Sequence, residues 1–185
     1  MQKQITNEAF QNEFDICVLG ENEHVDMFSC GDQDLDDFIL NESPAYTKAK
    51  ISVTHVVVRK TDGQVVAYFS LANGKLSVND FNSNSEFNRF RKRRFAHEKQ
   101  IKSYPAVKLC RLGIATTEKG QGLGSFLLNI VRAMFTNNNH SGCRFLTVDA
   151  YKTAVPFYEK NGFDRLTKRE SRNETIPLYY DLASF

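Results

Sequence analysis

The sequence predicts an α/β protein, in which a mixed β-sheet carries helices on its faces. Three observations indicate this class: a hairpin of β-branched strands, a strand–helix–strand crossover unit, and a long amphipathic helix inside that unit. The chain has 185 residues, which is enough for one domain with a buried core. Because no repeat, low-complexity linker or clear boundary divides it, we expect residues 1–185 to form a single domain.

The N-terminal half predicts two short helices and then the hairpin. The first helix has Leu35, Phe38 and Ile39 on one face, and Asp32 or Asp34 can cap it. A turn over 61–64 joins the two strands of the hairpin, and residues 79–85 are polar and predict a loop. The elements expected here are helices over 32–41 and about 45–50, and strands over 53–59 and 65–71.

The C-terminal half contains the crossover unit and the clearest helix of the sequence. This helix begins after a glycine-rich turn, ends at Asn137, and carries a continuous apolar stripe. The stripe consists of Leu123, Phe126, Leu127, Ile130, Val131, Met134 and Phe135. The other elements expected here are strands over 107–115, 145–150 and 176–182, and a helix over 153–160 that ends before Gly162.

The amino-acid composition argues against a membrane protein, a disulfide-rich protein and a metal site. The chain is 41% apolar and 25% charged, as globular proteins are. It has no run of about 18 apolar residues, and its N-terminus lacks the apolar stretch of a signal peptide, so we expect no membrane segment. The four cysteines have no C-x-x-C spacing and the four histidines stand apart. We therefore expect reduced thiols, a cytoplasmic location and no metal site.

Charge is distributed unevenly along the chain. Residues 1–42 contain eleven acidic side chains and one basic one, whereas residues 89–111 contain nine basic side chains and one acidic one. The basic stretch favours a polyanionic partner. A solvated surface, or a contact with the acidic N-terminal region within the protein or across a dimer, would explain it equally well. Phe87, Phe90 and Phe95 interleave with it and either stack on bases or anchor the segment to the core.

The glycine-rich turn predicts an anion site. Gly120, Gly122 and Gly124 lie between a buried strand and the amphipathic helix, where they allow a ligand to approach the backbone closely. The free amides of a helix N-terminus and the helix dipole favour an anion such as a pyrophosphate. No Gly-Lys-Ser/Thr ends the turn, and its spacing matches the dinucleotide fingerprint poorly.

Three blocks together resemble the GNAT family, the GCN5-related N-acetyltransferases: residues 110–115, 119–124 and 154–163. The resemblance implies the GNAT fold, a mostly antiparallel twisted sheet with a central splayed parallel strand pair and helices on both faces. It also implies an enzyme that transfers an acetyl group from acetyl-CoA to a primary amine. Lys119 stands where the family usually has Gln or Arg, and Tyr151 where it often has Asn.

The resemblance also implies the site residues. Tyr158 is expected to protonate the leaving sulfur of coenzyme A, although it would also serve as a core aromatic beside Phe157. No general base is evident, since Glu118 is expected at the surface, and we interpret Cys110 as a structural thiol and not as a nucleophile. The expected cofactor-binding residues are Leu112, Ile114, Ala115, Lys119, Gly120, Gln121, Gly122, Leu123, Gly124 and Ser125.

A narrower resemblance concerns the acceptor. The Phe28–Phe38 block, together with residues 68–71 and Arg111, is similar to the acetyltransferase toxins of bacterial toxin–antitoxin pairs. It implies acetylation of aminoacyl-tRNA, a homodimer and a ribbon-helix-helix antitoxin. The expected substrate-binding residues are Arg91, Lys92, Arg93, Arg94 and Arg111. The alternatives are an acetyltransferase for a small-molecule amine or a protein amine, and a non-enzymatic module that binds coenzyme A.

Overall fold

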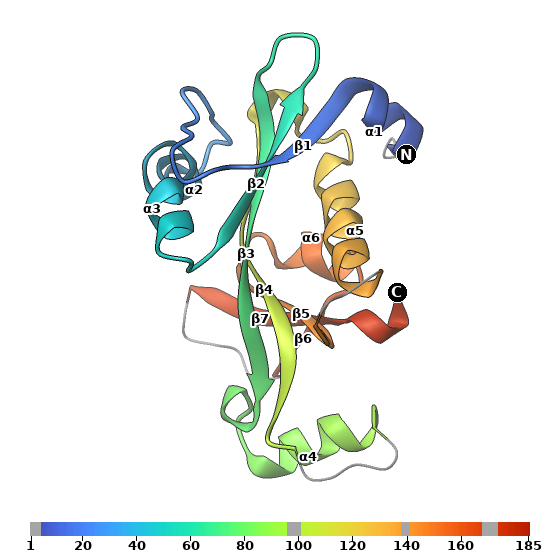
Figure 1. Cartoon of the computed structure of the whole chain (residues 1–185). Coiled ribbons are helices and arrows are strands. Elements are labelled where there is room, and N and C mark those ends of the chain that lie inside the picture. The colour runs from blue at the N-terminus through green and yellow to red at the C-terminus, as the bar shows by residue number, and fades with distance from the viewer. Residues whose placement is uncertain (1–4, 96–100, 138–140, 168–173) are drawn as a thin grey trace. The chain divides into compact units, whose positions relative to one another are not determined.

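The computed structural model describes residues 5–95, 101–137, 141–167 and 174–185 and confirms the α/β class (Figure 1). The chain divides into two compact units. Unit 1 comprises Met1–Ala72 and Leu109–Val131, and unit 2 comprises Asn73–Lys108 and Arg132–Phe185. Two long strands, β3 (Val65–Ser77) and β4 (Ser103–Ile114), run through both units.

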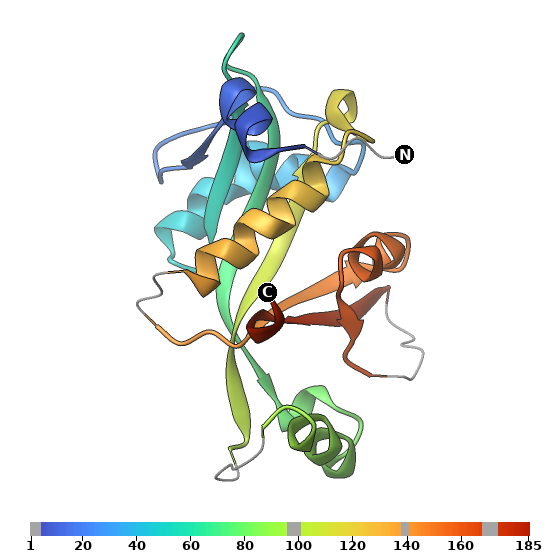
Figure 2. The same cartoon turned by 90° about the vertical axis from the view of Figure 1, so that its right-hand side faces the viewer.

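Unit 1 has the strand order β1-β2-β3-β4. The β1–β2 and β2–β3 pairs are antiparallel, which confirms the predicted hairpin. Within this unit, α2 and α3 lie on one face of β2 and β3, and α1 and α5 lie on the other (Figures 1 and 2). The further elements of this unit are α1 (Asn7–Glu13), β1 (Phe14–Val18), α2 (Gln33–Asp37), the π-helical turn η1 (Phe38–Glu42), α3 (Ser43–Lys48), β2 (Val53–Arg59), the 3₁₀ turn η3 (Thr116–Glu118) and the start of α5 (Leu123–Thr136).

Local chemistry explains the first helices of unit 1. The Asp32 carboxylate caps α2 by accepting a hydrogen bond from the Leu35 amide at 3.2 Å. The π-helical turn then precedes Pro44, which has no amide hydrogen to donate. The Ser43 hydroxyl instead donates to the Ile39 carbonyl at 3.3 Å. The predicted helix over 32–41 is thus confirmed as α2 and η1, and Phe38 lies in the core with no exposed surface.

Helix α5 follows its predicted stripe only in part. Leu123, Leu127 and Val131 are buried as expected, and Phe126 stacks on Phe10 of α1 at 4.5 Å between ring centroids. Met134, however, is 38% exposed, so its place in the stripe was predicted wrongly. Near the C-terminal end of the helix the side chain of Arg132 is buried instead, at 6% exposure.

Unit 2 has the strand order β3-β4-β5-β7-β6. The β4–β5 pair is parallel, as predicted for the centre of the sheet, and its ladder ends at the Lys108–Thr147 pair although β4 continues to Ile114. The β5–β7 and β7–β6 pairs are antiparallel. The further elements of this unit are the 3₁₀ turn η2 (Val78–Asp80), α4 (Asn84–Lys92), β5 (Phe145–Tyr151), α6 (Val155–Lys160), β6 (Asp164–Arg165), β7 (Thr175–Asp181) and the 3₁₀ turn η4 (Leu182–Ser184).

An aromatic cluster forms the core beneath α4. Phe87 and Phe90 of this helix are buried against Tyr104, Phe145 and Tyr179. The phenylalanines of the basic stretch therefore anchor the segment and do not present free faces to bases. No helix in the described part of the chain is both long and apolar enough to cross a membrane.

Candidate functional site

The glycine-rich turn between η3 and α5 requires glycine for its backbone conformation. Gly120 and Gly122 have φ angles of +79° and +89°, in the left-handed region that other residues rarely adopt. A Cβ atom added at Gly120 would meet no heavy atom within 4 Å, so the conformation and not a lack of space accounts for that glycine.

The amides of this turn form a free set of donors. The first amide of this region to bind the helix backbone is that of Phe126, which donates to the Gly122 carbonyl at 3.0 Å. The amides from Gly120 to Ser125 donate to no other residue that the structure describes. No acidic side chain lies in the first turn of α5. The turn, which contains the expected cofactor residues 120–125, therefore fits the pyrophosphate of coenzyme A.

A largely buried ion pair lies beside the turn and contacts it. Glu118 is 9% exposed and lies 2.5 Å from Arg59 Nη2, and the side-chain Nε2 of Gln121 donates to it at 3.3 Å. The expectation of a surface carboxylate at Glu118 was thus wrong, because a partner 59 residues earlier buries it. The hydrogen bond to Glu118 raises the pKa of Arg59. A cavity of about 160 Å³ adjoins Glu118, but the carboxylates of Glu118 and Glu13 make it unsuited to phosphate.

The side chain of Lys119 points to the Phe28–Phe38 block. Its ammonium donates to the Cys30 carbonyl at 2.6 Å, and the Thr116 amide donates to the Ser29 carbonyl at 3.0 Å. The Cys30 amide in turn donates to the Asp36 carboxylate at 2.7 Å. The departure from the family's usual Gln or Arg therefore has a structural use, in which the lysine ties this block to the glycine-rich turn.

The end of β4 presents a free edge. The Ala115 amide donates to the Val66 carbonyl of β3 at 2.8 Å, so it is not available to a cofactor. Because backbone groups of a strand alternate between its two edges, the amides of Ile114 and Leu112 point away from β3. Since β4 ends the strand order of unit 1, that edge pairs with no described strand of this unit.

In unit 2, Tyr158 lies on α6 and is 7% exposed. Burial raises the pKa of its phenol to about 12. Its ring packs edge-on against Phe163 at 5.3 Å, and its hydroxyl makes no hydrogen bond with any residue of the described ranges. Arg132 donates to the Asn161 carbonyl at the end of α6 and lies 3.9 Å from the Tyr180 ring, so it fixes the helix that carries Tyr158.

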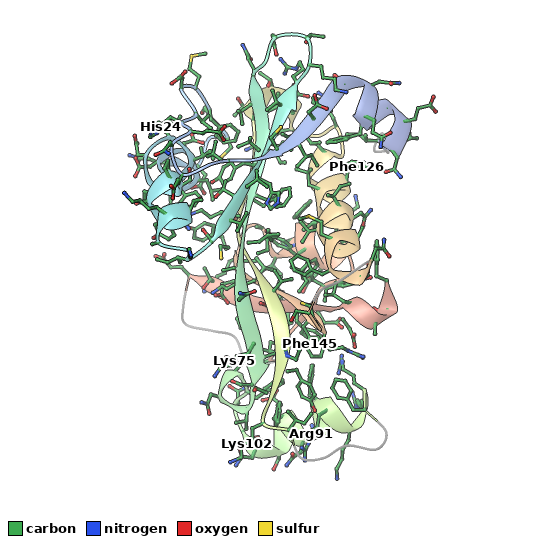
Figure 3. The ribbon with its side chains drawn as sticks, in the orientation of Figure 1. His24, Lys75, Arg91, Lys102, Phe126 and Phe145 are labelled. Carbon is green, nitrogen blue, oxygen red and sulfur yellow. The ribbon has the colours of Figure 1, made fainter. Side chains whose placement is uncertain are left out.

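The basic side chains at the end of α4 and directly after it fall into two groups. Lys92 and Arg93 are exposed and Arg91 is half-buried. Arg94, by contrast, donates to the Tyr179 hydroxyl at 2.5 Å and lies 3.4 Å from Asp181. The Arg94 guanidinium is therefore engaged in the core of unit 2. Figure 3 shows Lys75 and Lys102, which the sequence analysis did not select, at the end of unit 2 that carries Arg91.

Arg111 extends from β4 toward the first helices of unit 1. Its guanidinium carbon lies 3.9 Å from the Phe38 ring centroid and 5.8 Å from that of Tyr46. Its nearest carboxylate oxygen belongs to Glu42, at 4.0 Å. Cys110, the preceding residue, is half-buried and forms no disulfide.

Comparisons with known proteins concern the domain and the fold. The family model of the acetyltransferase (GNAT) domain matches residues 95–179, which include β4, the glycine-rich turn and Tyr158. No curated protein sequence matches the chain. Among solved structures, AtaTR bound with AcCoA is similar, with a TM-score of 0.73 and 24% identity over 94% of this chain and 96% of that one.

Two further structures have the same fold. AtaT complexed with acetyl-methionyl-tRNAfMet has a TM-score of 0.69 and 25% identity, over 92% of this chain and 96% of that one. A KacT mutant has a TM-score of 0.73 and 20% identity, over 93% of this chain and 96% of that one. By its motifs, its domain match over residues 95–179 and its fold, the chain contains a GNAT acetyltransferase domain and resembles the toxin AtaT.

Proposed function

We propose that the chain acetylates the amino group of an aminoacyl-tRNA, with acetyl-CoA as the donor. The observation that carries the proposal is the likeness, at 25% identity over 92% of the chain, to AtaT complexed with acetyl-methionyl-tRNAfMet. The exposed cations Lys92 and Arg93, at the end of α4, support it, because Lys and Arg side chains bind a phosphate backbone without regard to sequence.

The residues of unit 1 would hold the donor. When bound, acetyl-CoA supplies an acetyl group activated as a thioester. The amides from Gly120 to Ser125 would bind its pyrophosphate, and the amides of Leu112 and Ile114 would bind the pantetheine arm in the manner of a neighbouring strand. The Ile114 amide is also the proposed donor to the thioester oxygen as negative charge develops on it.

Tyr158 would act as the general acid. The neutral amine of the acceptor forms a bond to the acetyl carbon, the carbon–sulfur bond breaks, and Tyr158 gives its phenolic proton to the leaving sulfur. The nitrogen, which carries one proton too many after it has bonded to the acetyl carbon, releases that proton to solvent. The phenolate of Tyr158 takes up a proton from solvent in turn. The raised pKa, about 12, keeps the phenol protonated at neutral pH, so its proton is in place when the carbon–sulfur bond breaks.

The assembly proposed for the chain follows the same branch of the family. We propose a single acetyltransferase domain, because β3 and β4 run through both compact units. The chain would form a homodimer, would bind a ribbon-helix-helix antitoxin, and would act in the cytoplasm, where charged tRNA is found. Arg91, Lys92 and Arg93 would contact the tRNA backbone, whereas Arg94 supports the core of unit 2.

The experiment measures transfer of labelled acetyl groups to charged tRNA, with free amino acids and polyamines in competition. Label on aminoacyl-tRNA is the expected result, and label only on small amines would overturn the acceptor. The variant Lys92→Gln/Arg93→Gln should raise KM for tRNA and lower the slope of log KM against log salt by about one to two. The matched control is Lys50→Gln/Lys60→Gln, which removes two exposed charges of unit 1 and should change neither.

A further inference from the structure

Arg111 is mostly buried, yet it leaves its hydrogen-bond donors unused. Its side chain is 20% exposed, and its Nε atom is buried with no partner. Glu42 Oε2 lies 4.0 Å from Nη2, which is too far for a hydrogen bond. Arg111 therefore donates no hydrogen bond to any residue in the part of the chain that the structure describes.

Other partly buried arginines of the described residues donate a hydrogen bond from an Nη atom, as Arg59, Arg94, Arg132 and Arg144 do. The Nε atoms of Arg132 and Arg144 are buried without a hydrogen bond, as that of Arg111 is. Arg59 contacts the carboxylates of Glu118 and Asp62 at 2.5 and 2.8 Å. Arg144 contacts Asp181 at 2.9 Å. Arg111 differs from these arginines because neither its buried Nε atom nor its Nη atoms donate to a described residue, and a buried donor without a partner costs stability. Its Nη atoms are therefore available to a ligand.

The surroundings of Arg111 hold its guanidinium in a fixed plane. The Phe38 ring lies 3.9 Å from the guanidinium carbon, and Tyr46 lies at 5.8 Å. An arginine that stacks on a ring keeps the donors on its edge available for a planar pair of oxygen atoms. Phe38 and Glu42 begin and end the π-helical turn η1, a type of turn that is frequent at functional sites.

We propose that Arg111 and Glu42 bind the reacting end of the acceptor, an inference that rests on the proposed function. Arg111 donates to an oxygen of the acceptor, and Glu42, which is 44% exposed, accepts a hydrogen bond from its amino group. An aminoacyl ester offers both partners, because its carbonyl oxygen and its amino group are attached to adjacent carbons. The terminal phosphate of tRNA offers the same oxygen chemistry, and the experiment separates these two sources.

The experiment compares Arg111→Lys and Glu42→Gln with the wild type on two acceptors, aminoacyl-tRNA and a simple aminoacyl ester that has no phosphate. Loss of a hydrogen bond to a charged group should raise the acceptor KM about 10- to 100-fold, with little change in the KM for acetyl-CoA. An increase on both acceptors assigns the carbonyl oxygen to Arg111, and an increase on tRNA alone assigns the phosphate. Arg165→Lys, which changes an exposed arginine paired with Glu159, is the control.

Unchanged acceptor KM and kcat in Arg111→Lys, with an active wild type, would overturn this inference and leave the proposed function standing. If the wild type acetylates no aminoacyl-tRNA, the proposed function fails, and calorimetric titration with the aminoacyl ester then decides the inference alone. If the aminoacyl ester binds Arg111→Lys more weakly than the wild type, the site is supported. If it binds both proteins equally, or binds neither, the inference is overturned. A structural role would instead lower the melting temperature of Arg111→Met, which the proposal expects to stay near that of the wild type.

Discussion

Gly113→Ala tests how β4 supports the Phe28–Phe38 block. A Cβ atom at Gly113 would lie 2.5 Å from Tyr68 Cε1 and 3.2 Å from Phe28 Cζ. Tyr68 has no exposed surface, and its hydroxyl donates to the Leu35 carbonyl at 2.7 Å. The ring has no free space to move into, so the added methyl group must displace Tyr68 and strain or break this hydrogen bond.

The cost is the sum of two effects. Overpacking of a tight core costs about 1–3 kcal/mol. Loss of a neutral hydrogen bond adds about 0.5–1.5 kcal/mol. We therefore expect Gly113→Ala to lower the free energy of unfolding by about 1.5–4.5 kcal/mol, a large share of the stability of a typical domain.

Urea denaturation measures this cost. Gly142→Ala is the control, because a Cβ atom at Gly142 would meet nothing within 4 Å, and it should change the free energy of unfolding by less than about 0.5 kcal/mol. In a Tyr68→Leu background the cost of Gly113→Ala should fall, since the ring that it strikes is gone. A cost below about 0.5 kcal/mol, or an equal cost in both backgrounds, would refute the reasoning.

Three further predictions follow from the contacts of single side chains. Tyr158→Phe should lower kcat about 10²- to 10⁴-fold and leave acetyl-CoA affinity unchanged in calorimetric titration, and an unchanged kcat would exclude it as the acid. Burial lowers the pKa of His55 below its ordinary 6.5, so the unfolded chain takes up more protons and stability is lost as the pH falls through that value. The measurement compares urea denaturation midpoints at about pH 8 and pH 5. The midpoint should fall less between these pH values for His55→Leu than for the wild type or for His24→Gln, a control at an exposed site, and an equal fall in all three proteins would contradict this. Lys119→Met should lower stability by about 1 kcal/mol by removing the bond to Cys30, with acetyl-CoA affinity within about threefold of the wild type. A tenfold loss of that affinity would show that the ammonium binds phosphate instead.

The sequence predicted the elements whose signals are local. The β2–β3 hairpin follows from β-branched runs on either side of Gly63, whose φ of +72° suits the turn. The glycine-rich turn and α5 follow from Gly120, Gly122 and the helical period. Strand β3, however, continues six residues beyond the predicted end at Leu71. At Gly74 an added Cβ would lie 3.6 Å from the Ala106 carbonyl oxygen, which is an ordinary contact, so the strand continues through this position without requiring glycine.

Features that depend on distant partners were not predictable. Helix α1 and strand β1 were missed, because the segment shows mainly its acidic composition and its burial comes through Phe10 and its contact with α5. Arg94 differs from Arg93 through its contacts with Asp181 and with Tyr179, which lies 85 residues away in the sequence. The unused donors of Arg111 likewise become evident only when its surroundings are known. A basic run therefore does not reveal which of its members face solvent.

The most direct test of the proposed function is to identify the acetylated product. Charged tRNA is incubated with the protein and acetyl-CoA and then digested with a ribonuclease. The mass of the terminal aminoacyl-adenosine is then measured by mass spectrometry. We predict an added acetyl group on the amino nitrogen of this fragment, and its absence when Tyr158→Phe replaces the wild type. An unmodified aminoacyl-adenosine, with acetyl-CoA bound and the wild-type protein folded, would contradict the proposed acceptor.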